Sequence, residues 1–138
     1  MLTKRRSRRP RLDPRTQKLI PSEYQECKAF WQWAQTQPIL KELLIKNANE
    51  HKSDEWFITA LLSVGMRPGI PDYHLPYNNG TYSGLWLEFK RSDQRDKPKK
   101  INQEAWLEKL SKFGHYACYV YSCDEAINIC TSYLNNIL

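Results

Sequence analysis

The sequence predicts an α/β protein with a mixed central β-sheet flanked by helices. Two observations favour this class. Segments with helical periodicity alternate along the chain with segments of strand-like alternation, and one pair of strand-like segments is separated by a turn sequence that favours an antiparallel hairpin. A chain of 138 residues is long enough for the core of one such domain.

The first predicted helix begins at Ser22. Ser22 and Gln25 form a capping box, and two glutamates in the first turn suit the positive end of the helix dipole. The expected core face consists of Cys27, Phe30, Trp31 and Ala34, which follow at helical spacing. Trp33 lies away from this stripe, so we expect it to be exposed. Residues 39–45 follow and are expected to end in a short strand.

A second helix is expected to begin at Ser53 and to end at Gly65, a natural capping residue. Its inward-facing residues would be Trp56, Ala60, Leu61 and Val64. Residues 70–76 and 84–91 are then predicted to pair as a hairpin, because the Asn-Asn-Gly sequence at 78–80 is typical of a turn.

The last third of the chain contains three more predicted elements. Residues 101–113 have helical periodicity, and Gly114 is expected to end that helix. Residues 116–121 are typical of a strand, and a final helix begins at Asp124. The order is therefore helix, short strand, helix, hairpin, helix, strand, helix.

The predicted hairpin carries the candidate site. Residues 85–90 alternate, so Trp86, Glu88 and Lys90 share one face. The hairpin brings Asp72 near Glu88, so two carboxylates and a lysine converge at one edge of the sheet. Close carboxylates repel each other, and a divalent cation between them removes the repulsion. Few, hard oxygen ligands suit Mg²⁺ or Mn²⁺, which together with water and a cationic side chain allow phosphodiester hydrolysis.

The order of these motifs resembles the VRR-NUC family, the virus-type replication and repair nucleases of the PD-(D/E)XK superfamily. Members carry G-x-x-x-G-x-P-D, a strand ending in E-x-K-R, a helix with Q-x-x-W, and a glycine before the last strand. The matching residues here are Gly65, Gly69, Pro71, Asp72, Glu88, Lys90, Arg91, Gln103, Trp106 and Gly114. The resemblance extends over residues 22–138 and implies a restriction-endonuclease-like αβββαβ core.

The resemblance implies a metal-dependent DNA endonuclease. Asp72 and Glu88 would hold Mg²⁺ or Mn²⁺, with the backbone carbonyl of Phe89 as a third ligand. Lys90 would orient the attacking water. The implied substrate is branched DNA, such as a Holliday junction or a flap, in the DNA repair or replication of a phage or mobile element.

Four further residues are candidates for supporting roles. The resemblance implies that Gln103 reaches the metal-bound water or a phosphate, and that Glu23 supports the water or a second ion. Asn49 lies where phage-type members have a proline–asparagine pair, and it is also an ordinary turn former. His74 follows Asp72 by two residues on the same strand face, so it is a candidate for contact with the substrate.

Positive charge is concentrated at the N-terminus. Residues 1–18 contain eight basic residues and one acid, whereas the remainder contains thirteen basic and fourteen acidic residues. We therefore divide the chain into a basic arm without regular structure, residues 1–21, and a nuclease-like domain, residues 22–138, and expect a polyanionic partner. A second basic segment is the loop at 91–100. The candidate DNA-binding residues are Lys4, Arg5, Arg6, Arg8, Arg9, Arg11, Arg91, Lys97, Lys99 and Lys100.

The cysteines and the hydropathy exclude other classes. The four cysteines lack the paired spacing of zinc sites, so we interpret them as reduced residues of a cytoplasmic protein, in the host cell if a phage encodes it. No apolar run reaches membrane-spanning length. Three alternatives remain open: a nicking or sequence-specific endonuclease with the same site, a non-catalytic nucleic-acid-binding protein, and a protein-interaction module.

Paired cuts on a four-way junction require two sites related by a two-fold axis. A symmetric homodimer supplies them with one kind of interface. We therefore expect a homodimer, with Trp33 as the candidate contact.

Overall fold

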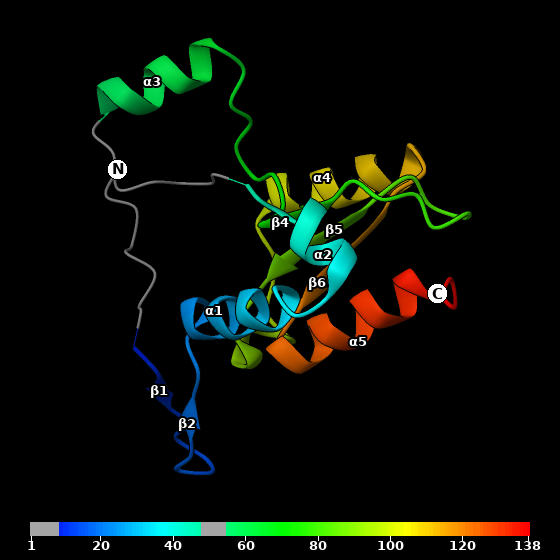
Figure 1. Ribbon diagram of the computed structural model, residues 1–138. Helices are drawn as coiled ribbons and strands as arrows, with labels where there is room; N and C mark the ends of the chain where they lie inside the picture. The colour runs from blue at the N-terminus through cyan, green and yellow to red at the C-terminus, as the bar shows by residue number, and fades with distance from the viewer. Residues whose placement is uncertain (1–8, 48–54) are drawn as a thin grey trace.

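The computed structural model of the protein describes residues 9–47 and 55–138. The elements are β1 (Arg11–Leu12), β2 (Leu19–Ile20), α1 (Glu23–Ala34), α2 (Pro38–Leu43), β3 (Ile45–Lys46), α3 (Glu55–Ser63), β4 (Tyr73–Leu75), β5 (Leu85–Phe89), a 3₁₀ turn η1 (Ser92–Gln94), α4 (Ile101–Lys112), β6 (Tyr116–Val120) and α5 (Cys123–Leu134). Within this order, α1, β3, β4, β5, α4 and β6 follow the predicted αβββαβ succession (Figure 1).

The central sheet has four strands in the order β3–β4–β5–β6. β3 and β4 are antiparallel, β4 and β5 are antiparallel, and β5 and β6 are parallel. The register places Tyr73 opposite Leu87 and His74 opposite Trp86. The mixed sheet and the hairpin are therefore confirmed.

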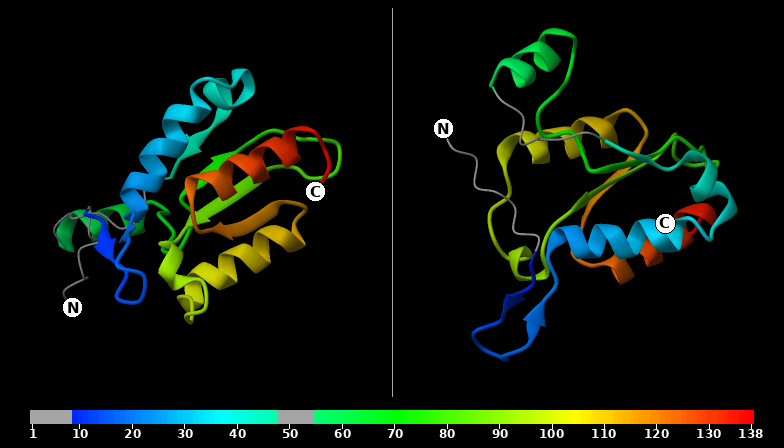
Figure 2. Two further views of the ribbon diagram at one scale, coloured as in Figure 1. Left: turned by 90° about the horizontal axis from the view of Figure 1, so that it is seen from below. Right: turned by 60° about the vertical axis from the view of Figure 1, so that its left-hand side comes forward.

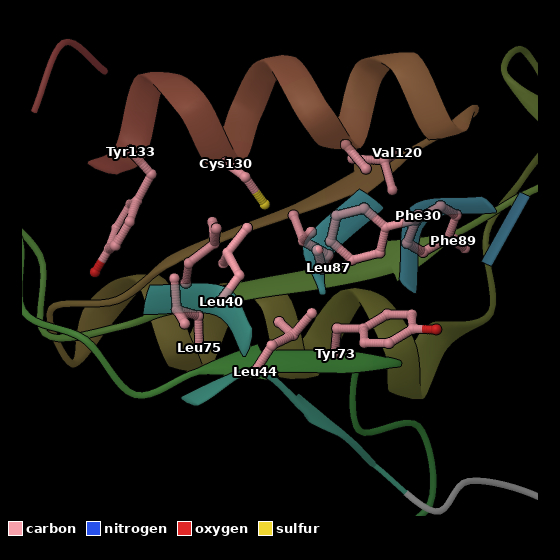
Figure 3. Close-up of a cluster of buried hydrophobic side chains, with 13 residues drawn as sticks. Phe30, Leu40, Leu44, Tyr73, Leu75, Leu87, Phe89, Val120, Cys130 and Tyr133 are labelled. Carbon is pink, nitrogen blue, oxygen red and sulfur yellow. The ribbon is translucent and has the colours of Figure 1, made fainter. Parts of the chain in front are cut away.

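Helices cover both faces of this sheet. α1 and α5 lie together on one face, and α4 lies on the other (Figure 2). The core is the apolar face beneath α1 and α5, where alternate strand residues meet the helices (Figure 3). Its fully buried members include Phe30, Leu75, Leu87, Phe89, Val120, Cys130 and Tyr133.

The two tryptophans of α1 are placed differently from our expectation. The capping box at Ser22 is present, and Phe30 and Ala34 are buried as predicted. Trp33, however, packs on the core and stacks on Phe30, with ring centroids 6.1 Å apart, whereas Trp31 is 39% exposed. The buried arc of α1 is displaced from the predicted stripe because α1 contacts both α5 and the sheet.

Helix α3 also differs from its prediction. Its expected inward face is not covered: none of its residues is buried, and Trp56 and Val64 are 77% and 81% exposed. Figure 1 shows α3 apart from the sheet and its covering helices. Helical periodicity predicts an apolar face but not what covers it. The predicted helix end is confirmed, since Gly65 has a positive φ and donates to the carbonyl of Leu62.

Part of the basic arm has regular structure. β1 and β2 pair antiparallel, so residues 11–20 form a short hairpin where we expected no secondary structure. Division of the chain into an arm and a domain stays a prediction. The described ranges do not include five of the candidate residues, namely Lys4, Arg5, Arg6, Arg8 and Asn49, nor the expected helix start at Ser53. No helix within the described residues has the length and apolar character needed to cross a membrane.

Candidate active site

The two carboxylates meet on the two central strands of the sheet, not at its edge as we expected. Asp72 directly precedes β4, and Glu88 lies in β5. Each is 1% exposed. The backbone N–H of Asp72 donates to Oε2 of Glu88 at 3.2 Å, and the N–H of Phe89 donates to Oδ2 of Asp72 at 2.8 Å. The hairpin therefore holds both acids in place through reciprocal hydrogen bonds.

Lys90 and Gln103 complete this group. Nζ of Lys90 lies 3.6 Å from Oε1 of Glu88 and donates to Oε1 of Gln103 at 2.5 Å. Nε2 of Gln103 donates to Oε1 of Glu88 at 2.8 Å. The expected contact of Gln103 with the metal-bound water or a phosphate stays a prediction. In the folded chain both ends of its amide connect the lysine to the acid, so Gln103 positions these two side chains.

Lys46 is a site residue that the sequence did not reveal. It lies in β3, and its Nζ is 3.4 Å from Oδ1 of Asp72. Its neighbour Asn47 donates from its side chain to the carbonyl of Pro71 at 2.9 Å. The short strand expected after residue 39 was the available signal. The pairing of this strand with β4 brings Lys46 to the site, and the local sequence does not predict that pairing.

Gly69, one glycine of the motif, lies in the segment before Asp72, where the chain passes close to α4. Gly69 has φ +82°, and a β-carbon there would lie 3.0 Å from the backbone carbon of Asn102 in α4. Nε1 of Trp106, also in α4, donates to the carbonyl of Pro68 at 3.1 Å. This close approach requires glycine and ties the chain leading to Asp72 to the helix that carries Gln103.

Glu23 lies at the margin of the site. Burial raises the pKa of the Cys27 thiol to about 12, and the charges of Asp72 and Glu23 add to the effect while Lys46 opposes it. Glu23 therefore lies within electrostatic range of Cys27, and its Oε2 atom is buried. Across residues 9–47 and 55–138, no three His, Cys, Asp or Glu side chains form a metal-ligating group. The role of Glu23 in supporting the water or a second ion stays a prediction.

Tyr119 is a second residue of the site that the sequence did not reveal. It is the partner of Glu88 across β5 and β6, and Lys90 lies 6.0 Å from its ring centroid. Burial raises its pKa to about 12, and the charges of Glu104 and Glu88 act in the same direction. Its hydroxyl is buried and has no hydrogen-bond partner among the described residues. A neutral hydroxyl donor therefore lies beside the acid–lysine group.

The basic loop at 91–100 uses two of its cations internally. Arg91 binds both carboxylate oxygens of Asp93 at 2.5 and 2.9 Å. Lys99 donates to the carbonyls of Gln94 and Lys97. Its ammonium group also lies over the rings of Tyr119 and Tyr121. Arg91 and Lys99 therefore stabilise the loop. Its two exposed candidate residues for binding a phosphate are Lys97 and Lys100, and the arm contributes the exposed Arg9 and Arg11.

The donor set fits a hard divalent cation. Asp72 and Glu88 are linked by reciprocal hydrogen bonds, and one lysine nitrogen lies close to each carboxylate, at 3.4 and 3.6 Å. Mg²⁺ accepts few protein ligands because it keeps several waters, so a pair of acids with one backbone carbonyl suffices.

Comparison with known proteins supports the fold. No family model matches the chain, and no curated protein matches it. Among solved structures, the chain is similar to a VRR_NUC domain protein, with a TM-score of 0.66 and 19% sequence identity. The match covers 80% of this chain and 88% of the other. At this identity it shows the fold, which confirms the architecture that the motifs implied.

Proposed function

We propose that this protein is a VRR-NUC-type DNA endonuclease that hydrolyses phosphodiester bonds with Mg²⁺ or Mn²⁺. The observation that carries the proposal is the buried group of Asp72, Glu88, Lys90 and Gln103, in which hydrogen bonds join side chains from the β4–β5 hairpin and from α4. The shared fold and the ordered motifs support it. Buried charges are costly, so a group of this kind on a sheet face is expected to serve chemistry.

Asp72 and Glu88 would hold the ion, with the carbonyl of Phe89 as a further ligand. When bound there, the cation would neutralise phosphate charge and make a bound water more acidic. The protein's own contribution is preorganisation. The N–H groups of Asp72 and Phe89 fix one oxygen of each carboxylate, so the acids need little rearrangement during the reaction.

Lys90 would act on water and phosphate. An ammonium group has three donors, and in the structure one is directed at Gln103. The remaining donors can orient the attacking water or bind a phosphate oxygen as negative charge builds up. Gln103 holds the ammonium beside Glu88, so it is a positioning residue. Lys46 is more exposed and lies next to Asp72, where it can contact the DNA backbone.

Branched DNA and a homodimer belong to the same proposal. Holliday junctions and flaps are the substrates that the motif resemblance implies, and paired cuts on a junction would require two sites. Trp33 is no longer our candidate contact, because it is half-buried and packs against Phe30 of the core. Sedimentation equilibrium over a range of protein concentrations tests the dimer without assigning its interface.

The deciding experiment compares labelled linear, flap, forked and four-way DNAs in Mg²⁺, Mn²⁺ or EDTA. We expect metal-dependent cleavage of branched DNA by the wild type and none by Glu88→Gln. Glu108→Gln, an exposed acid of α4, is the matched control and should cleave normally. Binding without cleavage in any metal would overturn the nuclease and favour the non-catalytic nucleic-acid-binding protein. Cleavage of linear DNA in one sequence only would favour a sequence-specific enzyme.

A further inference from the structure

An aromatic pair lies on the same sheet face as the carboxylates. His74 follows Asp72 by two residues, and Trp86 precedes Glu88 by two, so both share that face. The register of β4 and β5 pairs His74 with Trp86. Their rings are stacked, with centroids 3.8 Å apart and planes at 11°. The pair is thus one step along the hairpin from the acids, about 6.5 Å at strand rise.

Neighbouring residues hold the pair rigidly. Nε1 of Trp86 donates to Nδ1 of His115 at 3.2 Å, and the His115 ring lies perpendicular to the indole at 5.9 Å. Gly84 makes room for this contact, because a β-carbon there would lie 3.0 Å from Nδ1 of His115. A ring held in place in this way is suited to stacking.

The stack is partly open to solvent. His74 and Trp86 are each half-buried, and the β3 residue opposite His74, Ile45, is 47% exposed. On the other side, Trp86 faces the small side chain of Ala117. Within the described residues, Trp86 is the one ring that stacks on His74. On its β3 side the imidazole borders its register partner Ile45, an aliphatic side chain that is itself 47% exposed, and no aromatic ring of residues 9–47 and 55–138 stacks there.

We infer that His74, backed by Trp86, is a subsite that stacks one unpaired nucleobase next to the phosphate held at Asp72 and Glu88. The inference rests on the proposed function for its ligand, DNA. A base is joined to its phosphate through one sugar, so a base beside that phosphate is within reach of a ring one strand step away. Bases inside a duplex are already stacked on both faces. The subsite therefore selects nucleotides that a branch point, flap or end leaves unpaired.

The test measures binding in EDTA, where cleavage does not interfere. Short oligo-dT is compared with an oligonucleotide of the same length whose sugar–phosphate backbone carries no bases, so both present the same charge. Wild type should bind oligo-dT about tenfold more tightly, the effect of one base stack. His74→Ala should remove most of this preference, and His74→Phe should retain it. Trp56→Ala, which changes an exposed tryptophan of α3, is the matched control and should behave as wild type.

Each outcome decides the inference. Equal wild-type affinity for the two oligonucleotides overturns it, and so does a full preference in His74→Ala. Trp86→Ala should also lose the preference, and circular dichroism shows whether that variant is folded; His74→Ala carries the test if it is not. If the protein prefers oligo-dT but never cleaves DNA, the subsite is supported and the proposed nuclease function is overturned. If it cleaves DNA but shows no base preference, the nuclease function is supported and the subsite is overturned.

Discussion

Both faces of the β4–β5 hairpin carry deeply buried residues, but different forces stabilise them. On one face, Tyr73, Leu75, Leu87 and Phe89 pack beneath α1 and α5 and remove apolar surface from water. On the other, Asp72 and Glu88 are as deeply buried, and hydrogen bonds from the backbone and from Gln103 satisfy them.

The difference shows how to interpret alternation in a strand. Strands covered on both faces are usually apolar throughout, and alternation usually indicates that one face meets water. Here Asp72 and Glu88 are buried, and Gln103 of α4 binds Glu88, whereas His74 and Trp86 on the same face are half-buried, so around the acids the alternation indicates buried charges rather than a solvated face. Buried charges are tolerated only when other groups pair with them. Substitutions of the charged residues or of their partners therefore test the polar face, and substitutions of the apolar residues test the other face.

The largest expected effect is the loss of a carboxylate charge from the polar face. Asp72→Asn and Glu88→Gln should each slow cleavage by about a thousandfold or more, because several kcal/mol of charge stabilisation depend on the ion. DNA affinity should persist or increase, since negative charge near the phosphate is lost. Single-turnover cleavage and fluorescence anisotropy measure the two quantities. Full cleavage activity in either variant contradicts the assignment.

Lys90→Ala should reduce the cleavage rate by about 10²- to 10⁴-fold, the usual contribution of a positioned proton-transfer or charge-stabilising group. Metal affinity, measured by calorimetric titration, should change little. Lys90→Arg should not restore cleavage, because a planar fork does not replace a compact ammonium. The matched variant is Lys46→Ala, whose more exposed ion pair with Asp72 should alter folding stability by at most about 1 kcal/mol. Loss of the metal site with Lys90 would indicate a structural role.

A substitution on the apolar face should affect stability and leave chemistry unchanged. Leu87 is fully buried between Trp86 and Glu88, and Leu87→Ala should lower the free energy of unfolding by about 2–5 kcal/mol. Urea denaturation measures this loss, and the cleavage rate per folded molecule should remain that of the wild type. Leu62→Ala on the exposed α3 is the control and should change stability by at most about 0.5 kcal/mol. A large rate loss in folded Leu87→Ala would show that the faces are coupled.

Gln103→Met should have a smaller effect than loss of an acid or of Lys90. It removes the bridge between Lys90 and Glu88 while filling similar space, and positioning partners of this kind contribute about 10- to 100-fold. The cleavage rate should fall with little change in DNA affinity. Weakened DNA binding with an unchanged rate would instead indicate that Gln103 contacts phosphate directly.

The smallest effect on cleavage is expected from removing N-terminal basic residues, which belong to neither face of the hairpin. Deleting residues 2–8 removes four basic residues and leaves the β1–β2 hairpin intact. Affinity for every DNA shape should fall, and the slope of log affinity against log salt should flatten by about 0.9 for each lost phosphate contact. Cleavage at saturating DNA should persist. An unchanged slope would show that this segment does not bind the DNA backbone.

Local sequence was sufficient for the main features of the site. Alternation placed Glu88 and Lys90 on one face, and the turn at 78–80 predicted the hairpin that brings Asp72 to Glu88. The capping box at Ser22 likewise involves residues three apart. These features depend on periodicity and on contacts between near neighbours, which a single sequence contains.

Tertiary structure alone decided the remaining details. It paired Lys46 with Asp72, directed both ends of the Gln103 amide inward, packed Trp33 against the core and left α3 uncovered. Each of these outcomes depends on which distant segment lies alongside. A strand or helix pattern specifies the polarity of a face, whereas the partner of that face is determined only when the whole chain has packed.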